Sequence, residues 1–212
     1  MREAVRAGWE IEAQYVAPGG EAIADAGGLV FELAPHVIER VGSTEAPQPL
    51  MAVVKIRHCQ IHDLARARLV VIADRISDPG NLGTMLRSCE AAGVDGVVLI
   101  TGSVDPFNPK VVRASAGALF HVPVVADVPI HELQVLSMPL VGTSSHRGEP
   151  YTEANLVAPF ALVMGSEAHG VDDQIPLDSW LTIPHAGRAE SLNVAMATTV
   201  VVFEAMRQRG GR

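Results

Sequence analysis

Residues 69–100, LVVIADRISDPGNLGTMLRSCEAAGVDGVVLI, hold the pattern that decides the fold. Two short apolar runs, 69–73 and 96–100, flank a longer helix-like stretch at 82–92. Continuous runs of Val, Ile and Leu are typical of strands buried on both faces of a parallel sheet, and a helix is the usual crossover between such strands. The segment therefore predicts a strand, a helix and a strand of an α/β domain.

The same alternation continues toward the C-terminus. Further strands are predicted at 122–126, 140–143, 160–164 and 181–183. Further helices are predicted at 109–120, 130–136 and 192–207. Residues 69–212 should therefore form one α/β domain built on a parallel sheet.

Residues 1–54 repeat this pattern on a smaller scale. Helices are expected at 2–7, 21–26 and 36–41, and strands at 11–16, 29–33 and 51–54. This part should be a compact α/β module. Residues 55–68 join the two parts and are rich in basic side chains and histidine, so they are either a solvated linker or a surface that contacts phosphate groups.

The composition excludes several classes of protein. A formal net charge of −8 argues against a protein that holds nucleic acid by bulk charge, so any RNA site must be a local basic patch. The two cysteines, Cys59 and Cys89, form no CxxC pair and suggest neither a disulfide framework nor a zinc site. No apolar run approaches the roughly 20 residues that cross a bilayer, and residues 1–30 lack an export signal. A soluble, cytoplasmic protein is expected.

Three loops at strand ends combine glycine with polar side chains. The first is the stretch from Asp78 to Arg87, DPGNLGTMLR. Pro79 and Gly80 are expected to make a turn, and Arg87 should project from the first turns of the next helix toward the carboxyl edge of the sheet, where ligands bind in open α/β folds. The alternative interpretation is purely structural: a glycine turn followed by an arginine on the protein surface.

The second loop follows the strand at 160–164 and presents Glu167 beside Gly165. A lone glutamate there could equally organise the loop. His169 has no second ligand at metal-site spacing, so no metal is expected. The third loop, IPHAGRAESLNV at 183–194, leads into the last helix. Ser191 could cap that helix, which would leave Asn193 just inside it, where asparagine is unfavourable without a partner.

The last helix, 192–207, is apolar on nearly every face. A helix that is apolar all round is buried all round. A homodimer in which a second subunit covers this helix is therefore expected. The alternative is a central core helix of a monomer.

Taken together and in order, the three loops resemble the three motifs of the SpoU/TrmH family of SPOUT methyltransferases. Residues 108–120 also resemble the family's segment after its second strand, and the resemblance covers residues 69–208. Residues 1–54 resemble the family's N-terminal substrate-binding module, but that module usually opens with a further strand and helix, so it is expected to be shortened here. Ala168 stands where the family commonly has glycine.

The resemblance implies a trefoil-knotted parallel sheet that binds S-adenosyl-L-methionine in a bent form. The residues implied in the cofactor pocket are Thr143, Gly165, Ile183 and Leu192. The resemblance also implies a polar catalytic group that is completed across the dimer interface. Its residues are Asn81, Arg87, Glu167, Ser191 and Asn193. The implied reaction is methyl transfer to a ribose 2′-oxygen of RNA, with ribosomal RNA preferred to tRNA because of the attached module.

The family's proposed base is the arginine of the first motif, here Arg87. Guanidinium groups stay protonated in proteins and are poor bases. Our hypothesis is that Arg87 clamps the acceptor's phosphate or 2′-oxygen and stabilises developing alkoxide charge, while Ser191 and Asn193 orient the nucleotide.

Two other functions stay open. A nucleotide- or NAD-dependent α/β enzyme would share the alternation of strands and helices, although GxGxxG and GxxxxGK are both missing. A non-catalytic RNA-binding or ribosome-associated protein could keep the fold and lose the chemistry, which the presence of all five polar motif residues argues against.

Overall fold

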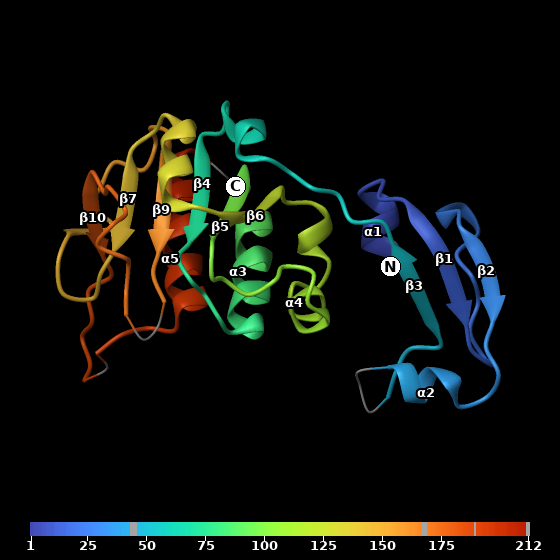
Figure 1. Ribbon diagram of the computed structural model, residues 1–212. Coiled ribbons are helices and arrows are strands. Elements are labelled where there is room, and N and C mark those ends of the chain that lie inside the picture. Colours follow the sequence, from blue (N-terminus) through green and yellow to red (C-terminus); the bar gives the residue numbers. More distant parts are fainter. Residues whose placement is uncertain (43–45, 167–168, 189, 211–212) are drawn as a thin grey trace. The chain divides into compact units, whose positions relative to one another are not determined.

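The computed structural model describes residues 1–42, 46–166, 169–188 and 190–210. This part of the chain forms two compact units, Met1–Arg57 and His58–Arg212 (Figure 1). The division falls inside the segment 55–68. Each unit has its own sheet and is described by itself.

The larger unit is built on a sheet of seven described strands, and each neighbouring pair runs parallel. The order in the sheet is β6-β5-β4-β9-β7-β10-β8. The strands are β4 (Leu69–Ala73), β5 (Gly96–Ile100), β6 (Val124–Val128), β7 (Leu140–Thr143), β8 (Glu149–Pro150), β9 (Phe160–Met164) and β10 (Ser179–Thr182). The expected α/β domain with a parallel sheet is confirmed.

The predicted strand limits are wrong near the two edges of the sheet. β6 is an edge strand and lies at Val124–Val128 instead of 122–126, and β10 lies at Ser179–Thr182 instead of 181–183. β8, the other edge strand, is not predicted at all. Strands at or near an edge are covered incompletely, so they need no continuous apolar run.

The central strands send alternate side chains to opposite faces of the sheet. Val71 and Leu162 pack on the face that is covered by α3 (Pro79–Ala91), α4 (Pro109–Ala114) and α5 (Val194–Gln208). Val70 and Val163 pack on the other face, which is covered by the 3-10 helices η2 (Ile61–Leu64) and η4 (Ile130–Leu136). α3 and α5 lie side by side (Figure 1), and the hydroxyls of Ser88 and Thr199 are 2.6 Å apart between them.

Two predicted helices take a different form. The helix expected at 109–120 is interrupted, because Ala116 and Gly117 have left-handed backbone angles (φ 51° and 98°). α4 ends before them, and a single 3-10 turn, η3 (Ala118–Phe120), follows. The segment 130–136 is the 3-10 helix η4. Among the helices of the described residues, none combines the length and the hydropathy that crossing a bilayer would require.

The smaller unit has a three-stranded sheet in which β1 runs parallel to β2 and antiparallel to β3. Its elements are α1 (Arg2–Arg6), β1 (Ile11–Val16), the 3-10 turn η1 (Ala24–Ala26), β2 (Leu29–Glu32), α2 (Val37–Val41) and β3 (Leu50–Val54). The helix expected at 21–26 shrinks to η1. The segment between β1 and β2 is instead held by the buried side chain of Gln14, whose amide donates to the carbonyls of Ile23 (3.1 Å) and Gly27 (2.9 Å).

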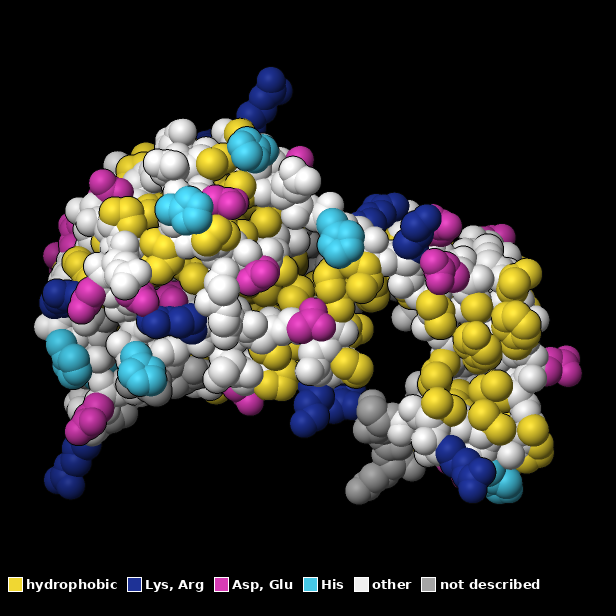
Figure 2. Space-filling view, in the orientation of Figure 1, with side chains coloured by type: hydrophobic (Ala, Val, Ile, Leu, Met, Phe, Trp, Pro, Cys, Tyr) yellow, Lys and Arg dark blue, Asp and Glu magenta, His cyan; other side chains and the backbone are white. Residues whose placement is uncertain are grey.

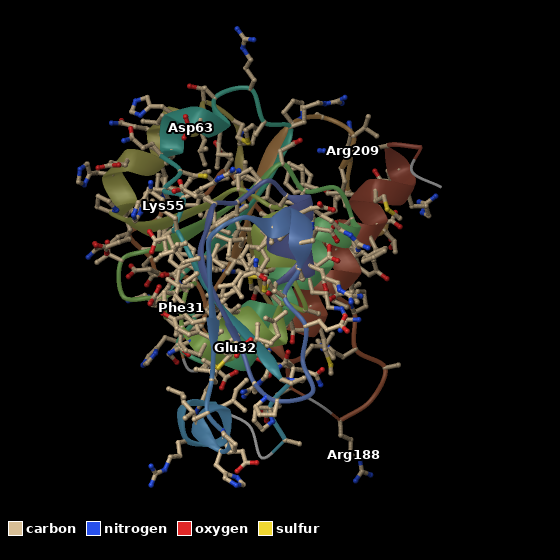
Figure 3. The ribbon with its side chains drawn as sticks, turned by 90° about the vertical axis from the view of Figure 1, so that its right-hand side faces the viewer. Phe31, Glu32, Lys55, Asp63, Arg188 and Arg209 are labelled. Carbon is tan, nitrogen blue, oxygen red and sulfur yellow. The ribbon has the colours of Figure 1, made fainter. Side chains whose placement is uncertain are left out.

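β2 lies at the edge of this small sheet and exposes most of its apolar side chains. Leu29 is 67% exposed and Val30 53% exposed. Phe31 stacks on Tyr15 with the ring centroids 5.3 Å apart. Figure 2 shows hydrophobic side chains gathered on one face of this unit, and Figure 3 marks Phe31 and Glu32.

Both ends of the segment 55–68 are packed. Arg57 lies over the ring of Trp9 (5.6 Å) and donates to the carbonyls of Ala7 and Gly8 in the smaller unit. Ile61 and Leu64 are buried in the larger unit. The basic side chain of Arg57 is therefore partly engaged by its own unit.

Candidate active site

The three motif loops leave the carboxyl ends of strands that lie close together in the sheet. The first loop follows β4, the second follows β9 and the third follows β10. β7 lies between β9 and β10, and its own following loop, 144–148, joins the group. Because all these strands are parallel, their carboxyl ends share one edge, which is the usual ligand edge of an open α/β sheet.

A pocket of about 630 Å³ opens at this edge. Its walls come from the loops after β7, β9 and β10 and from the start of α5. The residues from the sequence-based site that line it are Thr143, Gly165, Ile183, Ser191, Leu192 and Asn193. The four residues implied as cofactor-binding thus lie around one cavity.

Gly165 is required by the sharp return of the second loop. A Cβ at this position would lie 2.1 Å from the carbonyl carbon of Gly170 and 2.2 Å from the nitrogen of Val171. The backbone of Gly170 donates to the carbonyl of Ser166 (2.9 Å) and closes the loop. The pocket wall here is therefore bare backbone, which offers peptide N–H and C=O groups to a ligand. Glu167, the expected catalytic carboxylate of this loop, lies outside the described residues.

A cation stacked on an aromatic ring forms another part of the wall. The guanidinium of Arg147 lies 3.8 Å from the ring centroid of Trp180, and both residues line the pocket. Gly142 makes room for this ring, since a Cβ there would be 3.0 Å from Trp180 Cε3. The sequence did not reveal this pair, because it depends on β7 and β10 being neighbours in the sheet.

His185 adds a polar atom that lacks a partner in the described structure. Its Nε2 is buried and makes no hydrogen bond to the described residues, and the side chain lines the pocket. Leaving such a nitrogen unpaired costs about 1–3 kcal/mol. A polar ligand in the pocket would remove that cost, so the site fits a cofactor with hydrogen-bonding groups. His185 lies within the third motif loop, but sequence reasoning gave it no role.

Asn193, rather than Ser191, is the N-cap of the last helix. Its side-chain oxygen accepts from the backbone nitrogens of Ala195 (3.0 Å) and Met196 (3.3 Å). Its amide nitrogen donates to Oδ1 of Asn81 at 2.8 Å. Ser191, which could have capped this helix, does not, because α5 begins at Val194 and Asn193 occupies the capping position. The same side chain joins the first motif to the third.

The first motif is a helix start and not a separate turn. Asp78 is the N-cap of α3 and accepts from the backbone nitrogen of Asn81 (2.7 Å), and Pro79 is the first helical residue. Proline is favourable there because its missing N–H would be unpaired anyway. Gly83 lets α3 approach α4, since a Cβ would lie 2.4 Å from Ala114 Cβ.

Arg87 lies farther from the carboxyl edge than predicted. It is in the third turn of α3, about 12 Å along the helix axis from Pro79. Its side chain is exposed, and within the described part of one chain it neither lines the pocket nor makes a hydrogen bond or ion pair. Arg87 therefore lies beyond the first turns of α3, and its projection toward the carboxyl edge stays a prediction.

The described residues contain no group of three histidine, cysteine or acidic side chains that is arranged to hold a metal ion. The polar groups around the pocket include amides, hydroxyls, imidazoles and backbone, together with the charged side chains of Arg147, Asp173 and Glu190. This set suits hydrogen bonding to an organic ligand.

Known proteins share both the sequence and the fold. The chain is 41% identical over 178 residues to the 23S rRNA (guanosine(2553)-2'-O)-methyltransferase RlmP of Bacillus subtilis, covering 82% of this chain and 71% of that protein. The AdoMet-bound rRNA methyltransferase from Sinorhizobium meliloti has a TM-score of 0.87 and 31% identity, covering 98% of this chain and 85% of that one. AviRb from Streptomyces viridochromogenes in complex with AdoMet has a TM-score of 0.85 and 30% identity, covering 100% and 88%.

The family assignment rests on most of the larger unit. Residues 68–203 match the SpoU rRNA Methylase family, and this range contains all three motif loops. The pocket, the strand order and these matches agree: the chain belongs to the SpoU rRNA methylase family.

Proposed function

We propose that this protein transfers the methyl group of S-adenosyl-L-methionine to a ribose 2′-hydroxyl of ribosomal RNA in the cytoplasm. The observation that carries the proposal is that the second and third motif loops line one pocket, with Asn81 of the first motif bonded to Asn193 beside it. The names of RlmP and of the AdoMet-bound neighbours support the reaction and the cofactor.

The pocket residues would hold the cofactor in distinct ways. The bare backbone of Gly165 and Gly170 can donate and accept hydrogen bonds, and Nε2 of His185 is buried without a partner in the described structure. Ile183 and Leu192 supply apolar surface. When bound, the cofactor supplies an electrophilic methyl group on a sulfonium.

The polar motif residues would position the acceptor. We propose that Asn81, Ser191 and Asn193 orient the target nucleotide, together with Glu167. The cap of α5 fixes the Asn193 side chain, so its bond to Asn81 is held in place before the RNA arrives. Such preorganisation is how a protein aligns an acceptor with a methyl donor.

Arg87 would act in the pocket of a second copy. Met196 is 63% exposed and Phe203 37% exposed, and both lie on one stripe of α5 beside Thr199, which contacts α3. We propose a homodimer that buries this stripe and brings Arg87 of one copy to the pocket of the other. There its guanidinium would bind the acceptor phosphate or stabilise charge on the 2′-oxygen.

We also propose the trefoil-knotted form of the sheet. β9 follows β7 and β8 along the chain but lies between β4 and β7 in the sheet. The chain must therefore return toward the centre of the sheet before it reaches β10 and α5. This return at the pocket edge supports the proposal.

Residues 1–54 are proposed as the RNA substrate-binding module, 55–68 as the basic linker and 69–212 as the catalytic domain. The smaller unit's own sheet and the division after Arg57 support this organisation.

The test is methyl transfer from labelled S-adenosyl-L-methionine to purified ribosomal RNA, with tRNA as the comparison. Methylation of the 2′-oxygen removes the nucleophile of alkaline RNA cleavage, so the label should appear in alkali-resistant dinucleotides. Label found only in tRNA, or only in alkali-sensitive nucleotides, would contradict the proposed substrate or the proposed atom. Calorimetry with S-adenosylhomocysteine and with NAD separates the methyltransferase from a nicotinamide enzyme.

A further inference from the structure

A buried carboxylate lies at the carboxyl end of β4, outside the three motif loops. Asp74 follows β4 directly and is 0% exposed. Its Oδ2 accepts from the backbone nitrogen of Asp172 at 2.7 Å, and its Oδ1 accepts from Nε of Arg75 at 3.0 Å. Nη1 of Arg75 lies 2.9 Å from Oδ2 of Asp172. The three residues thus form a closed cycle of charge-assisted contacts, which are among the stronger hydrogen bonds in proteins.

One member of this cycle, Asp172, belongs to the loop that lines the pocket. The described residues of the loop that follows β9 are 165–166 and 169–173, and the lining residues on either side of Asp172 are Val171 and Asp173. The loop is fixed at its beginning by β9 and by the tight return at Gly165. Its far end meets Asp74 through Asp172. The described residues at the two ends of the loop are therefore both held, and the second anchor is the buried carboxylate of Asp74.

The backbone of Arg75 is held in a conformation that arginine rarely adopts. Its φ is +52°, in the left-handed region, where the Cβ of a residue other than glycine lies too close to the following carbonyl oxygen. Such a conformation persists only where surrounding contacts determine it, and it is commonest at functional sites. Here it lets one guanidinium reach both carboxylates.

We propose that Asp74, Arg75 and Asp172 form a latch that positions the pocket wall at residues 169–173 and so sets the affinity for S-adenosyl-L-methionine. This inference rests on the proposed function. The three are positioning residues, since none of them lines the described pocket. They act through the loop.

The contacts predict a rank order among conservative variants. Asp74→Asn is the most damaging, because the amide replaces one of the two acceptor oxygens by an NH2 donor, which then faces either the Asp172 nitrogen or the Arg75 guanidinium. Arg75→Lys keeps the charge but replaces the separate Nε and Nη1 donors by one ammonium nitrogen, so it cannot reproduce both contacts in their present geometry and its effect is intermediate. Asp172→Asn loses the ion pair yet keeps the backbone donor to Asp74, so its effect is the smallest.

Affinity is measured as the Kd of S-adenosylhomocysteine by calorimetry, and loop order as amide exchange at Gly170 and Asp172 in the free protein. Asp74→Asn should raise the Kd at least about tenfold, or about 1.4 kcal/mol. It should also speed exchange at these two amides without changing exchange in β4.

The matched control is Arg209→Ala. Arg209 donates to the backbone carbonyls of Arg68 (3.1 Å), Leu156 (2.8 Å) and Ala158 (2.9 Å), and neither it nor these three is among the described pocket residues. Its position near the end of the chain is labelled in Figure 3. This variant should lower the Tm and leave the Kd unchanged.

The outcomes separate the two proposals. A tenfold loss in Asp74→Asn and none in Arg209→Ala supports the latch. A Kd within twofold of the wild type in Asp74→Asn overturns it, whatever happens to the Tm. If Asp74→Asn does not fold, the Kd of Arg75→Lys decides in the same way. A wild-type protein that does not bind S-adenosylhomocysteine at all overturns the proposed function instead.

Discussion

Replacing Asn193 separates the capping of α5 from the contact between two motifs. Asn193→Ala removes the acceptor of two backbone N–H groups and the donor to Asn81. The lost cap costs about 1 kcal/mol. The lost bond to Asn81 is exposed and costs about 0.5 kcal/mol, the low end for a hydrogen bond. The free energy of unfolding should fall by about 1.5 kcal/mol, which lowers the Tm by about 3–6 °C in a chain of this size.

Asn193→Ser is the matched control, because serine caps a helix but is too short to reach Asn81. It should lower the free energy of unfolding by only about 0.5 kcal/mol in urea titrations. If Asn193 also orients the nucleotide, both variants should lose turnover equally while keeping their affinity for S-adenosylhomocysteine. Equal stability of the two variants would refute the capping role. Undiminished turnover in Asn193→Ser would refute the role in catalysis.

Three further changes test other parts of the site. Gly165→Ala should abolish binding of S-adenosylhomocysteine in calorimetry, since its Cβ would lie 2.1 Å from Gly170, and binding at the wild-type Kd would show that the loop can relax. Phe203→Glu should convert a dimer to a monomer in sedimentation and remove methyl transfer; a wild type that is already monomeric contradicts the proposed interface. Burial raises the pKa of the Cys89 thiol from 9.0 to about 12. The folded protein therefore binds this proton more tightly than the unfolded chain does, and the free energy of unfolding should fall as the pH rises from about 9 to 12. Urea titrations should show this loss, and Cys89→Ala should reduce it.

The core of the fold could be predicted because it depends on local patterns. β4, β5, β7 and β9 have the predicted limits, since β4, β5 and β9 are buried at every residue and β7 is buried at all but its last residue. The predictions failed where burial is partial or where the backbone turns. β8 has two residues and no apolar pattern, and the helix expected at 109–120 breaks at Ala116, whose left-handed conformation no local signal indicates.

The site could be predicted only as far as order along the chain allows. The three motifs identify loops at strand ends, and a parallel sheet brings such ends to one edge. The strand order is not contained in any local pattern, and it is what brings Arg147 onto Trp180 and Asp74 to Asp172. These contacts join segments far apart in the sequence, so only the structure could reveal them.

The position of Arg87 links the site to the proposed assembly. Within one described chain the pocket is lined by residues from the second and third motifs, whereas Arg87 lies on the exposed side of α3. α3 is bonded to α5 through Ser88 and Thr199, and α5 leaves Met196 and Phe203 exposed on the stripe that includes Thr199. Burying that stripe against a second copy would also bury the surroundings of Arg87. One dimer interface would then explain two observations. It would cover the exposed apolar stripe of α5, and it would bring Arg87, which does not line the pocket of its own chain, to the pocket of the second copy.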